Sequence, residues 1–252
     1  MNIGWNAGGY ERDFSFVPAY GRDVIGLVDV RPGETCLDLG CGNGTLTVEL
    51  CERGLDAFGM DASPEMLALA RKSHPELRFI EGDATSFTLG RTVDVVFSNA
   101  VLHWIDRGRH PEMLSHVAAA LRPGGQFVFE CGGYGCGARI HAALADSFRR
   151  HGLVYEMPFY FPTVGEYAPL VEAAGMRVTD ASLFDRPTAL KGPDGIADWI
   201  HMFVRRPFDG VDEAVAGEIV AEAVEGLRRE MLRDGVWYAD YVRLRMRAVK
   251  IG

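Results

Sequence analysis

The sequence lacks the long apolar runs that membrane-spanning segments require. No stretch approaches the roughly 18 uncharged apolar residues of a transmembrane helix. The residues from Met1 to Tyr20 are rich in glycine and aromatic side chains, and they do not place a basic stretch before an apolar one, as a secretory signal does. We therefore expect a soluble, cytoplasmic protein.

Cysteine is scarce and is not spaced for metal binding or for disulfides. The five cysteines form no Cys-x-x-Cys pair, and an odd number does not suit a disulfide framework. We expect buried thiols and no metal site. A metal held by Cys131, Cys136 and a nearby histidine stays open as the less favoured alternative.

Basic residues are fewer than acidic residues. The chain has 35 Asp and Glu against 26 Lys and Arg, a formal net charge of −9. Binding to nucleic acid draws on clustered Lys and Arg, whereas Arg205-Arg206 and Arg228-Arg229 are short and lie among acidic residues. We expect a small-molecule substrate and no nucleic-acid or membrane partner. Monomer and homodimer both stay open.

The sequence does contain a regular alternation of short apolar runs with helical patterns between Thr35 and Glu130. Such alternation predicts βα units that build a parallel sheet covered on both faces. Ser63-Pro64 and Pro123-Gly124 supply the expected helix start and helix end. The predicted strands are Thr35–Leu39, Ala57–Met60, Arg78–Ile80, Val93–Ser98 and Gln126–Glu130.

The rest of the chain continues the α/β pattern and then becomes helical. Helices are predicted at Ala138–His151 and Val164–Ala174, with a strand at Arg177–Leu183. Pro187 opens a helical insertion, residues 187–235, before an alternating run from Trp237 to Val249 that is typical of an antiparallel edge strand with one face wetter than the other. No repeat or low-complexity linker divides the 252 residues, so we expect one domain with an amino-terminal cap at residues 1–30.

A glycine turn follows the first predicted strand. Glycines at a strand-to-helix junction permit positive φ and let a ligand touch the backbone, while the helix start offers unpaired N–H groups. A dinucleotide fingerprint would need glycine where this chain has Thr45, one residue after Gly44. Asp38, inside the strand, suits a ligand with an ammonium group better than a pyrophosphate.

Two further acids follow the next two strands. Asp61 lies about 20 residues after Gly40, where an acidic side chain accepts hydrogen bonds from ribose hydroxyls. Asp83 is placed to meet the exocyclic amine of an adenine. Together the two acids indicate a nucleoside that lies across three strand ends. The alternative is that they cap the following helices.

These motifs, in this order and spacing, resemble those of the class I S-adenosylmethionine (SAM)-dependent methyltransferases. The resemblance covers roughly residues 33–131, and it implies a Rossmann-like, doubly wound, mostly parallel seven-stranded sheet with an antiparallel last strand. The later segments Tyr160-Phe161-Pro162 and Phe184–Thr188, with Trp5–Tyr10 near the start, look like the trans-aconitate methyltransferase-like subgroup. The five matching motifs are Leu37–Gly44, Gly59–Ser63, Gly82–Ala84, Val93–Asn99 and Leu121–Gly125.

The resemblance implies SAM as the cofactor and suggests how it is bound. Gly40 and Gly42 would flank the methionine part, Asp61 the ribose, and Asp83 with Ala84 the adenine. Asn99, at the end of the fourth strand, would lie near the methionine. The full set of expected cofactor residues is Asp38, Gly40, Cys41, Gly42, Asp61, Ala62, Asp83, Ala84 and Asn99.

The residues after Asn99 bear on the acceptor. Enzymes that methylate nucleobases or glutamine often carry Asn-Pro-Pro-Tyr here, whereas this chain has Asn99-Ala100-Val101-Leu102-His103-Trp104. His103 is a candidate base, because histidine titrates near neutral pH; packing or positioning of the acceptor is its alternative role. We expect Tyr10, Trp104 and Tyr134 to line the substrate site, and no arginine cluster is apparent near it.

The sequence thus favours a SAM-dependent methyltransferase that acts on a small molecule, at oxygen or carbon. A non-catalytic SAM-binding subunit is one alternative, because the cofactor motifs indicate that SAM binds but not that a reaction follows. An NAD(P)-dependent oxidoreductase or epimerase is disfavoured by Asp38, by the early third glycine and by the lack of a Tyr-x-x-x-Lys pair.

Overall fold

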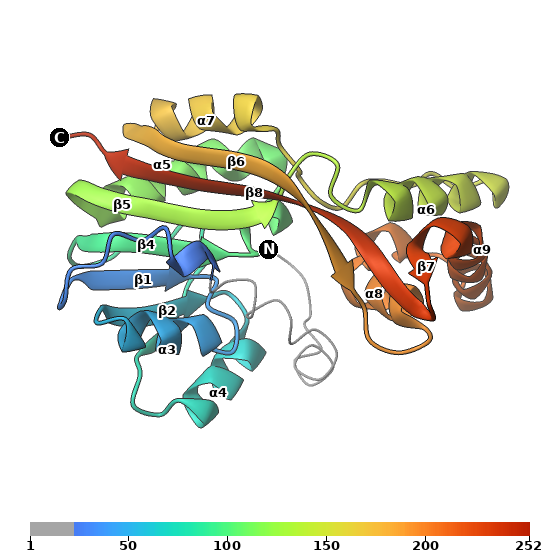
Figure 1. Cartoon of the computed structure of the whole chain (residues 1–252), viewed down its shortest axis with the longest axis horizontal. Coiled ribbons are helices and arrows are strands. Elements are labelled where there is room, and N and C mark those ends of the chain that lie inside the picture. The colour runs from blue at the N-terminus through green and yellow to red at the C-terminus, as the bar shows by residue number, and fades with distance from the viewer. Residues whose placement is uncertain (1–22) are drawn as a thin grey trace.

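The computed structural model describes residues 23–252. Among these residues, seven strands form one sheet in the order β3-β2-β1-β4-β5-β8-β6, and a two-residue strand, β7 (Leu232–Arg233), pairs with the start of β8 (Figure 1). The strands β1 to β5 are parallel, and β8 lies antiparallel between β5 and β6. The predicted fold class is therefore confirmed. The seven strands are β1 (Thr35–Leu39), β2 (Asp56–Asp61), β3 (Phe79–Glu81), β4 (Val93–Asn99), β5 (Leu121–Gly132), β6 (Met176–Ala189) and β8 (Val236–Lys250).

The helices begin where local chemistry favours a helix start. Ser63 accepts the N–H of Met66 before α4, and Thr163 forms a reciprocal capping box with Glu166 at the start of α7. The helices are α3 (Thr45–Glu52), α4 (Pro64–Ser73), α5 (His110–Ala120), α6 (Ala138–Arg150), α7 (Val164–Ala173), α8 (Gly195–Phe203) and α9 (Glu213–Met231). Short 3₁₀ turns are η1 (Leu102–Trp104), η2 (Arg107–Arg109) and η3 (Arg206–Phe208).

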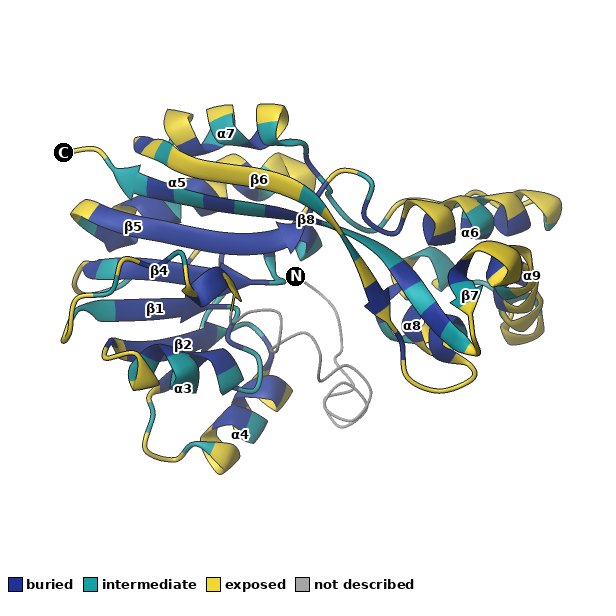
Figure 2. Ribbon diagram, viewed as in Figure 1, coloured by how far each residue is buried: buried dark blue, intermediate teal, exposed yellow. Residues whose placement is uncertain are grey.

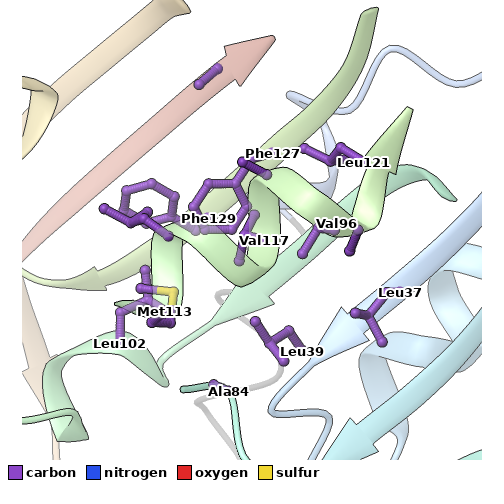
Figure 3. Close-up of a cluster of buried hydrophobic side chains, with 14 of the residues drawn as sticks. Leu37, Leu39, Ala84, Val96, Leu102, Met113, Val117, Leu121, Phe127 and Phe129 are labelled. Atoms are coloured by element: carbon purple, nitrogen blue, oxygen red, sulfur yellow. The ribbon is translucent and has the colours of Figure 1, made fainter. Parts of the chain in front are cut away.

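The two faces of the sheet bury separate hydrophobic clusters. One face packs against α5 and α7, with Leu37, Val96 and Phe127 of the sheet meeting Met113 and Val117 of α5 (Figure 3). The other face packs against α3 and against Val24, Ile25 and Val28. Because both faces of β1 and β4 are covered, these strands are nearly continuous apolar runs, which is why they were predictable.

A second hydrophobic unit lies beyond the carboxyl ends of β1, β4 and β5. Figure 1 shows that β6 and β8 continue past the sheet as a long antiparallel ribbon that reaches α6, α8 and α9. These helices and the ribbon share their own core, in which Trp199 and Trp237 are buried. Residues 138–150 and 195–239 are called the helical cap below; α6 is part of it, although the sequence did not assign this helix to the insertion.

Strand β6 is longer than predicted and passes through Pro187 to Ala189. The helical segment therefore begins after the strand and not at Pro187. Among the described residues β6 pairs only with β8, and most of its residues are exposed (Figure 2). Proline is tolerated on such an edge because its missing N–H removes no ladder hydrogen bond. In the described part of the chain, no helix has both the length and the apolar character that a membrane crossing demands.

Candidate functional site

A cavity of about 860 Å³, including its open mouth, lies at the carboxyl ends of β1, β2 and β4. Open α/β sheets bind their ligands at this edge. Eight of the nine expected cofactor residues line the cavity: Asp38, Gly40, Cys41, Gly42, Asp61, Ala62, Ala84 and Asn99. Eight further lining residues are not among those expected from the sequence: Leu39, Asn43, Thr45, Leu46, Met66, Gly82, Ala100 and Val101.

The glycine turn forms the floor of this cavity. Gly40 has φ +79°, and a Cβ atom there would lie 2.2 Å from Cγ2 of Val101, so no other residue fits without displacement. The N–H groups of Gly40 and Cys41 both donate to the carbonyl of Met60, at 2.7 and 3.0 Å, which ties the turn to β2. Helix α3 then begins at Thr45 after Gly44, with no side-chain cap. The N–H of Thr45 donates to Oδ1 of Asn43 at 3.3 Å.

Asp38 is a buried carboxylate at one side of the cavity. It is 1% exposed, and its Oδ2 accepts a hydrogen bond of 2.7 Å from Oγ1 of Thr47. Burial raises the pKa of Asp38 from 3.8 to about 7, and the neighbouring Asp61 adds to the rise while Thr47 opposes it. A cationic group beside Asp38 in the cavity would favour the ionised form of this carboxyl, because an opposite charge offsets the cost of its burial.

Asp61 and Asp83 occupy different positions relative to the cavity. Asp61 lines it and accepts the N–H of Gly42 at 2.9 Å and that of Ser63 at 2.8 Å; burial raises its pKa, and these hydrogen bonds oppose the rise. Asp83 is not a lining residue, although its neighbours Gly82 and Ala84 are. Its Oδ1 accepts from the N–H and the hydroxyl of Thr85. The helix that Asp83 would cap in the alternative interpretation is not present, because residues 84–86 form a turn.

The far end of the cavity is built by the residues after β4. Ala100 has φ +60°, an uncommon conformation for a residue with a side chain, and its N–H donates to the carbonyl of Glu130 at 2.8 Å. Trp104 lines the cavity, and its Nε1–H donates to the carbonyl of Ala100 at 3.2 Å. Its ring meets Phe159 edge-on, 4.8 Å between centroids. The indole ring of Trp104 therefore lies between the cavity and the aromatic residues beneath the helical cap.

His103 does not line the cavity. It is 9% exposed, and its Nδ1 accepts the N–H of Gly132 at 3.2 Å. Burial and, to a smaller extent, the charge of Arg243 hold the pKa of His103 well below its usual 6.5. The imidazole is therefore neutral near pH 7, and its basic nitrogen is already engaged.

The remaining expected site residues lie elsewhere. Tyr134 is 65% exposed and is not a lining residue; its N–H donates to the carbonyl of Pro162. Tyr10 lies outside the described residues. Cys131 and Cys136 are buried, and burial raises the pKa of the Cys131 thiol to about 12. Among the described residues no three His, Cys, Asp or Glu side chains gather as a metal site would require.

The expectation that no arginines cluster near the cleft is wrong. Glu130, at the end of β5, receives hydrogen bonds from Arg186 of β6 and from Arg243 and Arg245 of β8. Glu130 pairs directly with the cavity residue Asn99 across the β4–β5 ladder. These residues lie up to 115 positions apart in the chain, so their meeting is a product of the fold.

Comparison with known proteins agrees with this geometry. Residues 36–125 match the family described as a methyltransferase domain. The chain is 32% identical to an uncharacterized methyltransferase of Schizosaccharomyces pombe over 98% of both proteins. It is 31% identical to the trans-aconitate 2-methyltransferase of Deinococcus radiodurans, over 83% of this chain and 86% of that protein.

Solved structures show the same fold. Phosphoethanolamine N-methyltransferase 2 of Haemonchus contortus, determined with phosphomonomethylethanolamine and S-adenosylhomocysteine, has a TM-score of 0.61 to this chain at 18% identity. The likeness covers 98% of this chain and 57% of that one. At this level of identity the likeness establishes the arrangement of strands and helices.

Proposed function

The chain belongs to the class I SAM-dependent methyltransferases, in the subgroup that resembles trans-aconitate methyltransferases, and on that premise we propose that it methylates a small-molecule acceptor at oxygen. The observation that carries the proposal is the meeting of Asp38, Asp61 and the glycine turn in one cavity that ends at Trp104. This arrangement suits a compact ligand, and the acidic chain offers no broad basic surface to a nucleic acid.

The residues of the cavity fit the parts of SAM. Asp38 would receive the ammonium group of the methionine part, because a buried carboxylate gains most from a cationic partner. Asp61 would accept from the ribose hydroxyls while it holds the glycine turn through the N–H of Gly42. Ala84 and Gly82 would lie against the adenine, with Asp83 behind them. When bound, SAM supplies a methyl group that its positive sulfur already activates.

The acceptor that best fits this site is a carboxylic acid. The titratable side chains among the described lining residues are Asp38, Cys41 and Asp61, and burial raises the pKa of each. Asp38 and Asp61 are assigned to the cofactor, and the raised pKa of Cys41 keeps its thiol protonated, so these three side chains leave no base for an alcohol or a carbon acid, whereas a carboxylate needs none. The name of the Deinococcus relative, trans-aconitate 2-methyltransferase, points to the same class of acceptor.

His103 then has a positioning role in place of proton transfer. Its Nδ1 fixes the backbone at Gly132, where β5 ends, and its carbonyl accepts the N–H of Tyr160 at 3.1 Å. It thereby joins the loop after β4 to β5 and to the Phe159–Phe161 segment behind Trp104. The chain's contribution to rate is alignment of the acceptor and exclusion of water.

The experiment has two stages. Isothermal titration with S-adenosylhomocysteine should show binding to the wild-type protein, and Asp61→Ala should weaken it by about tenfold or more, since it removes charge-assisted hydrogen bonds. Asp56→Ala is the matched control, because Asp56 lies at the opposite end of the same strand and is exposed. No heat with either SAM or its product would contradict the assigned site.

The second stage identifies the acceptor. Wild-type protein with SAM is incubated with carboxylic acids, phenols and amines, and both S-adenosylhomocysteine and the methylated product are quantified. Methyl esters from the acids support the proposal. Turnover of amines but not acids would refute oxygen methylation, and cofactor binding without any product would support the non-catalytic alternative.

A further inference from the structure

One nitrogen of a buried histidine in the helical cap has no partner. His141 lies in the first turn of α6 and is 6% exposed. Its Nδ1 lies 2.6 Å from the hydroxyl oxygen of Tyr155, whereas its Nε2 makes no hydrogen bond within residues 23–252. Buried polar groups in folded proteins nearly all have partners, because an unmade hydrogen bond costs free energy. The Nε2 of His141 is therefore a candidate contact for a ligand.

The contact with Tyr155 indicates where the imidazole carries its proton. Hydrogen bonds from N–H donors to oxygen are about 2.7–3.2 Å long, and those from hydroxyl donors are shorter, so 2.6 Å fits donation from the Tyr155 hydroxyl to Nδ1. Burial lowers the pKa of His141 to about 4, so the ring is neutral near pH 7. A neutral imidazole whose Nδ1 accepts carries its proton on Nε2. The nitrogen without a partner is therefore an N–H donor.

A glycine lies beside this N–H group. Gly137 precedes α6 with φ +65°, a conformation that favours glycine. A Cβ atom at this position would lie 3.2 Å from Nε2 of His141 and 3.9 Å from Cη2 of Trp199. Any other residue at position 137 would therefore place its side chain against the nitrogen. On the side of the loop that joins β5 to α6, Nε2 thus faces a glycine and no side chain.

Aromatic rings connect His141 to the end of the cavity. The ring of His141 meets Phe159 edge-on, 5.4 Å between centroids, and Trp199 at 6.0 Å. Phe159 in turn meets Trp104, which lines the cavity, at 4.8 Å. Figure 1 shows α6 and α8 beyond the carboxyl ends of β4 and β5, the sheet edge at which the cavity lies. His141 is therefore one ring beyond the Trp104 end of the cavity.

These surroundings suit an uncharged oxygen atom on an apolar molecule. Aromatic rings pack well against flat apolar groups. Burial alone accounts for the lowered pKa of His141, so no charged group of the described chain is close enough to stabilise an anion beside it. A carboxylate at this position would lose its hydration without gaining a cation, which is costly. A hydroxyl or carbonyl oxygen can accept from Nε2 without that cost.

We propose that His141 is a specificity-determining residue whose Nε2–H donates to an uncharged oxygen on the apolar body of the methyl acceptor. The acceptor class is then an aromatic or other apolar monocarboxylic acid that carries a second, neutral oxygen remote from its carboxylate. This inference rests on the proposed function, because it assumes that the reacting carboxylate lies at the Trp104 end of the cavity. Since the ring of Phe159 lies between Trp104 and His141, entry of the acceptor requires that this ring turn aside.

The test compares pairs of acids that differ in one oxygen. Phenylacetate, phenylpropionate and cinnamate are each paired with the para-hydroxy and the para-carboxy form, and kcat/KM for methyl ester formation is measured with SAM. In at least one pair the wild type should prefer the para-hydroxy acid over its parent by about 3- to 10-fold, as one neutral hydrogen bond predicts. The para-carboxy acid should be the poorer substrate. His141→Phe should bring the preference to about one, and His141→Gln, which keeps a donor, should restore part of it.

His151→Phe is the matched control. His151 follows the other end of α6, where its Nε2 lies 3.3 Å from Oε1 of Glu222, and its replacement should leave the preference unchanged. Because each preference compares two acids on one protein, a purely structural role of His141 would not alter it. Equal preferences in wild type and His141→Phe would overturn the proposal, as would the absence of any preference in the wild type. Failure of the wild type to methylate any acid would instead contradict the proposed function.

Magnetic resonance of the wild type tests the same contact should His141→Phe fail to fold. With isotopically labelled histidine, the His141 signals at pH 7 should show the proton on Nε2. That N–H resonance should shift when the para-hydroxy acid with the highest kcat/KM is added to protein saturated with S-adenosylhomocysteine. A proton on Nδ1, or an N–H resonance that the bound acid leaves unchanged, would refute the assignment of His141 to the acceptor.

Discussion

Cofactor binding should release a proton from Asp38. This carboxyl is fully buried, and its pKa is raised from 3.8 to about 7, chiefly by burial. About nine-tenths of the protein therefore carries a protonated Asp38 at pH 6, and about a quarter at pH 7.5. If the ammonium group of the cofactor pairs with the ionised form, the apparent dissociation constant should be roughly eightfold weaker at pH 6 than at pH 7.5.

Calorimetry measures this linkage directly. Titration of S-adenosylhomocysteine at pH 6, in two buffers with different heats of ionisation, should report release of nearly one proton per molecule bound, and much less at pH 7.5. Thr47→Val removes the hydrogen bond that lowers the pKa of Asp38 and should move the whole profile to higher pH. The valine is nearly isosteric, so the fold should persist.

The same shift makes a prediction about the free protein. A carboxyl whose folded pKa exceeds its unfolded value stabilises the fold below the unfolded pKa, and this contribution is lost as pH rises through the folded pKa. The pKa of Asp38 is about three units higher in the folded protein, which corresponds to about 4 kcal/mol. The free energy of unfolding should therefore fall between pH 4 and 8, and Asp38→Asn should flatten this trend. A pH-independent dissociation constant, without proton release, would refute the assignment of Asp38 to the ammonium group.

Two further predictions concern the turn and the loop that frame the cavity. Gly40→Ala should lower the melting temperature and abolish cofactor binding, because φ is +79° and the new Cβ would lie 2.2 Å from Cγ2 of Val101; adding Val101→Ala should recover part of the stability but not the strain in φ. His103→Gln, which keeps an acceptor for the N–H of Gly132, should leave the pH dependence of kcat unchanged between pH 6.5 and 8.5, because the histidine is already neutral. A hundredfold loss of kcat with an altered pH profile would restore His103 as a base.

The sheet was largely predictable because most of its strands are buried on both faces. Such strands are apolar throughout and end at turn residues, as at Val93–Asn99, which was predicted to within one residue. Edge strand β6 was predicted too short, since the less exposed face of residues 184–189 includes Arg186 and Thr188, which give no apolar alternation. Strand β5 begins at Leu121, before Pro123-Gly124, because Leu121 pairs with Val93 through a register irregularity that the turn residues conceal.

The cofactor side of the site was more predictable than the acceptor side. Asp38, Asp61 and the glycines lie in short motifs, where each strand delivers its residues to the same edge within a few positions. No sequence pattern around Ala100 indicates its positive φ. Tyr134 was expected to line the substrate site only because of its position in a glycine-rich loop, and its side chain is exposed. Glu130 and the arginines that bind it come from β5, β6 and β8, which meet only after the chain has folded.

One local pattern does indicate the arginine cluster, although the sequence alone invites the opposite interpretation. Arg243, Arg245 and Arg247 alternate with apolar residues along β8, which is typical of a strand with one wet face. In the structure Arg243 is only 7% exposed. A guanidinium face that is turned away from solvent must obtain its hydrogen bonds from the protein, and Glu130 accepts from both Arg243 and Arg245. The net charge of −9 therefore excludes a broad basic surface but not a confined cluster of arginines, because electrostatic attraction over a few ångströms depends on the nearest charges and not on their sum.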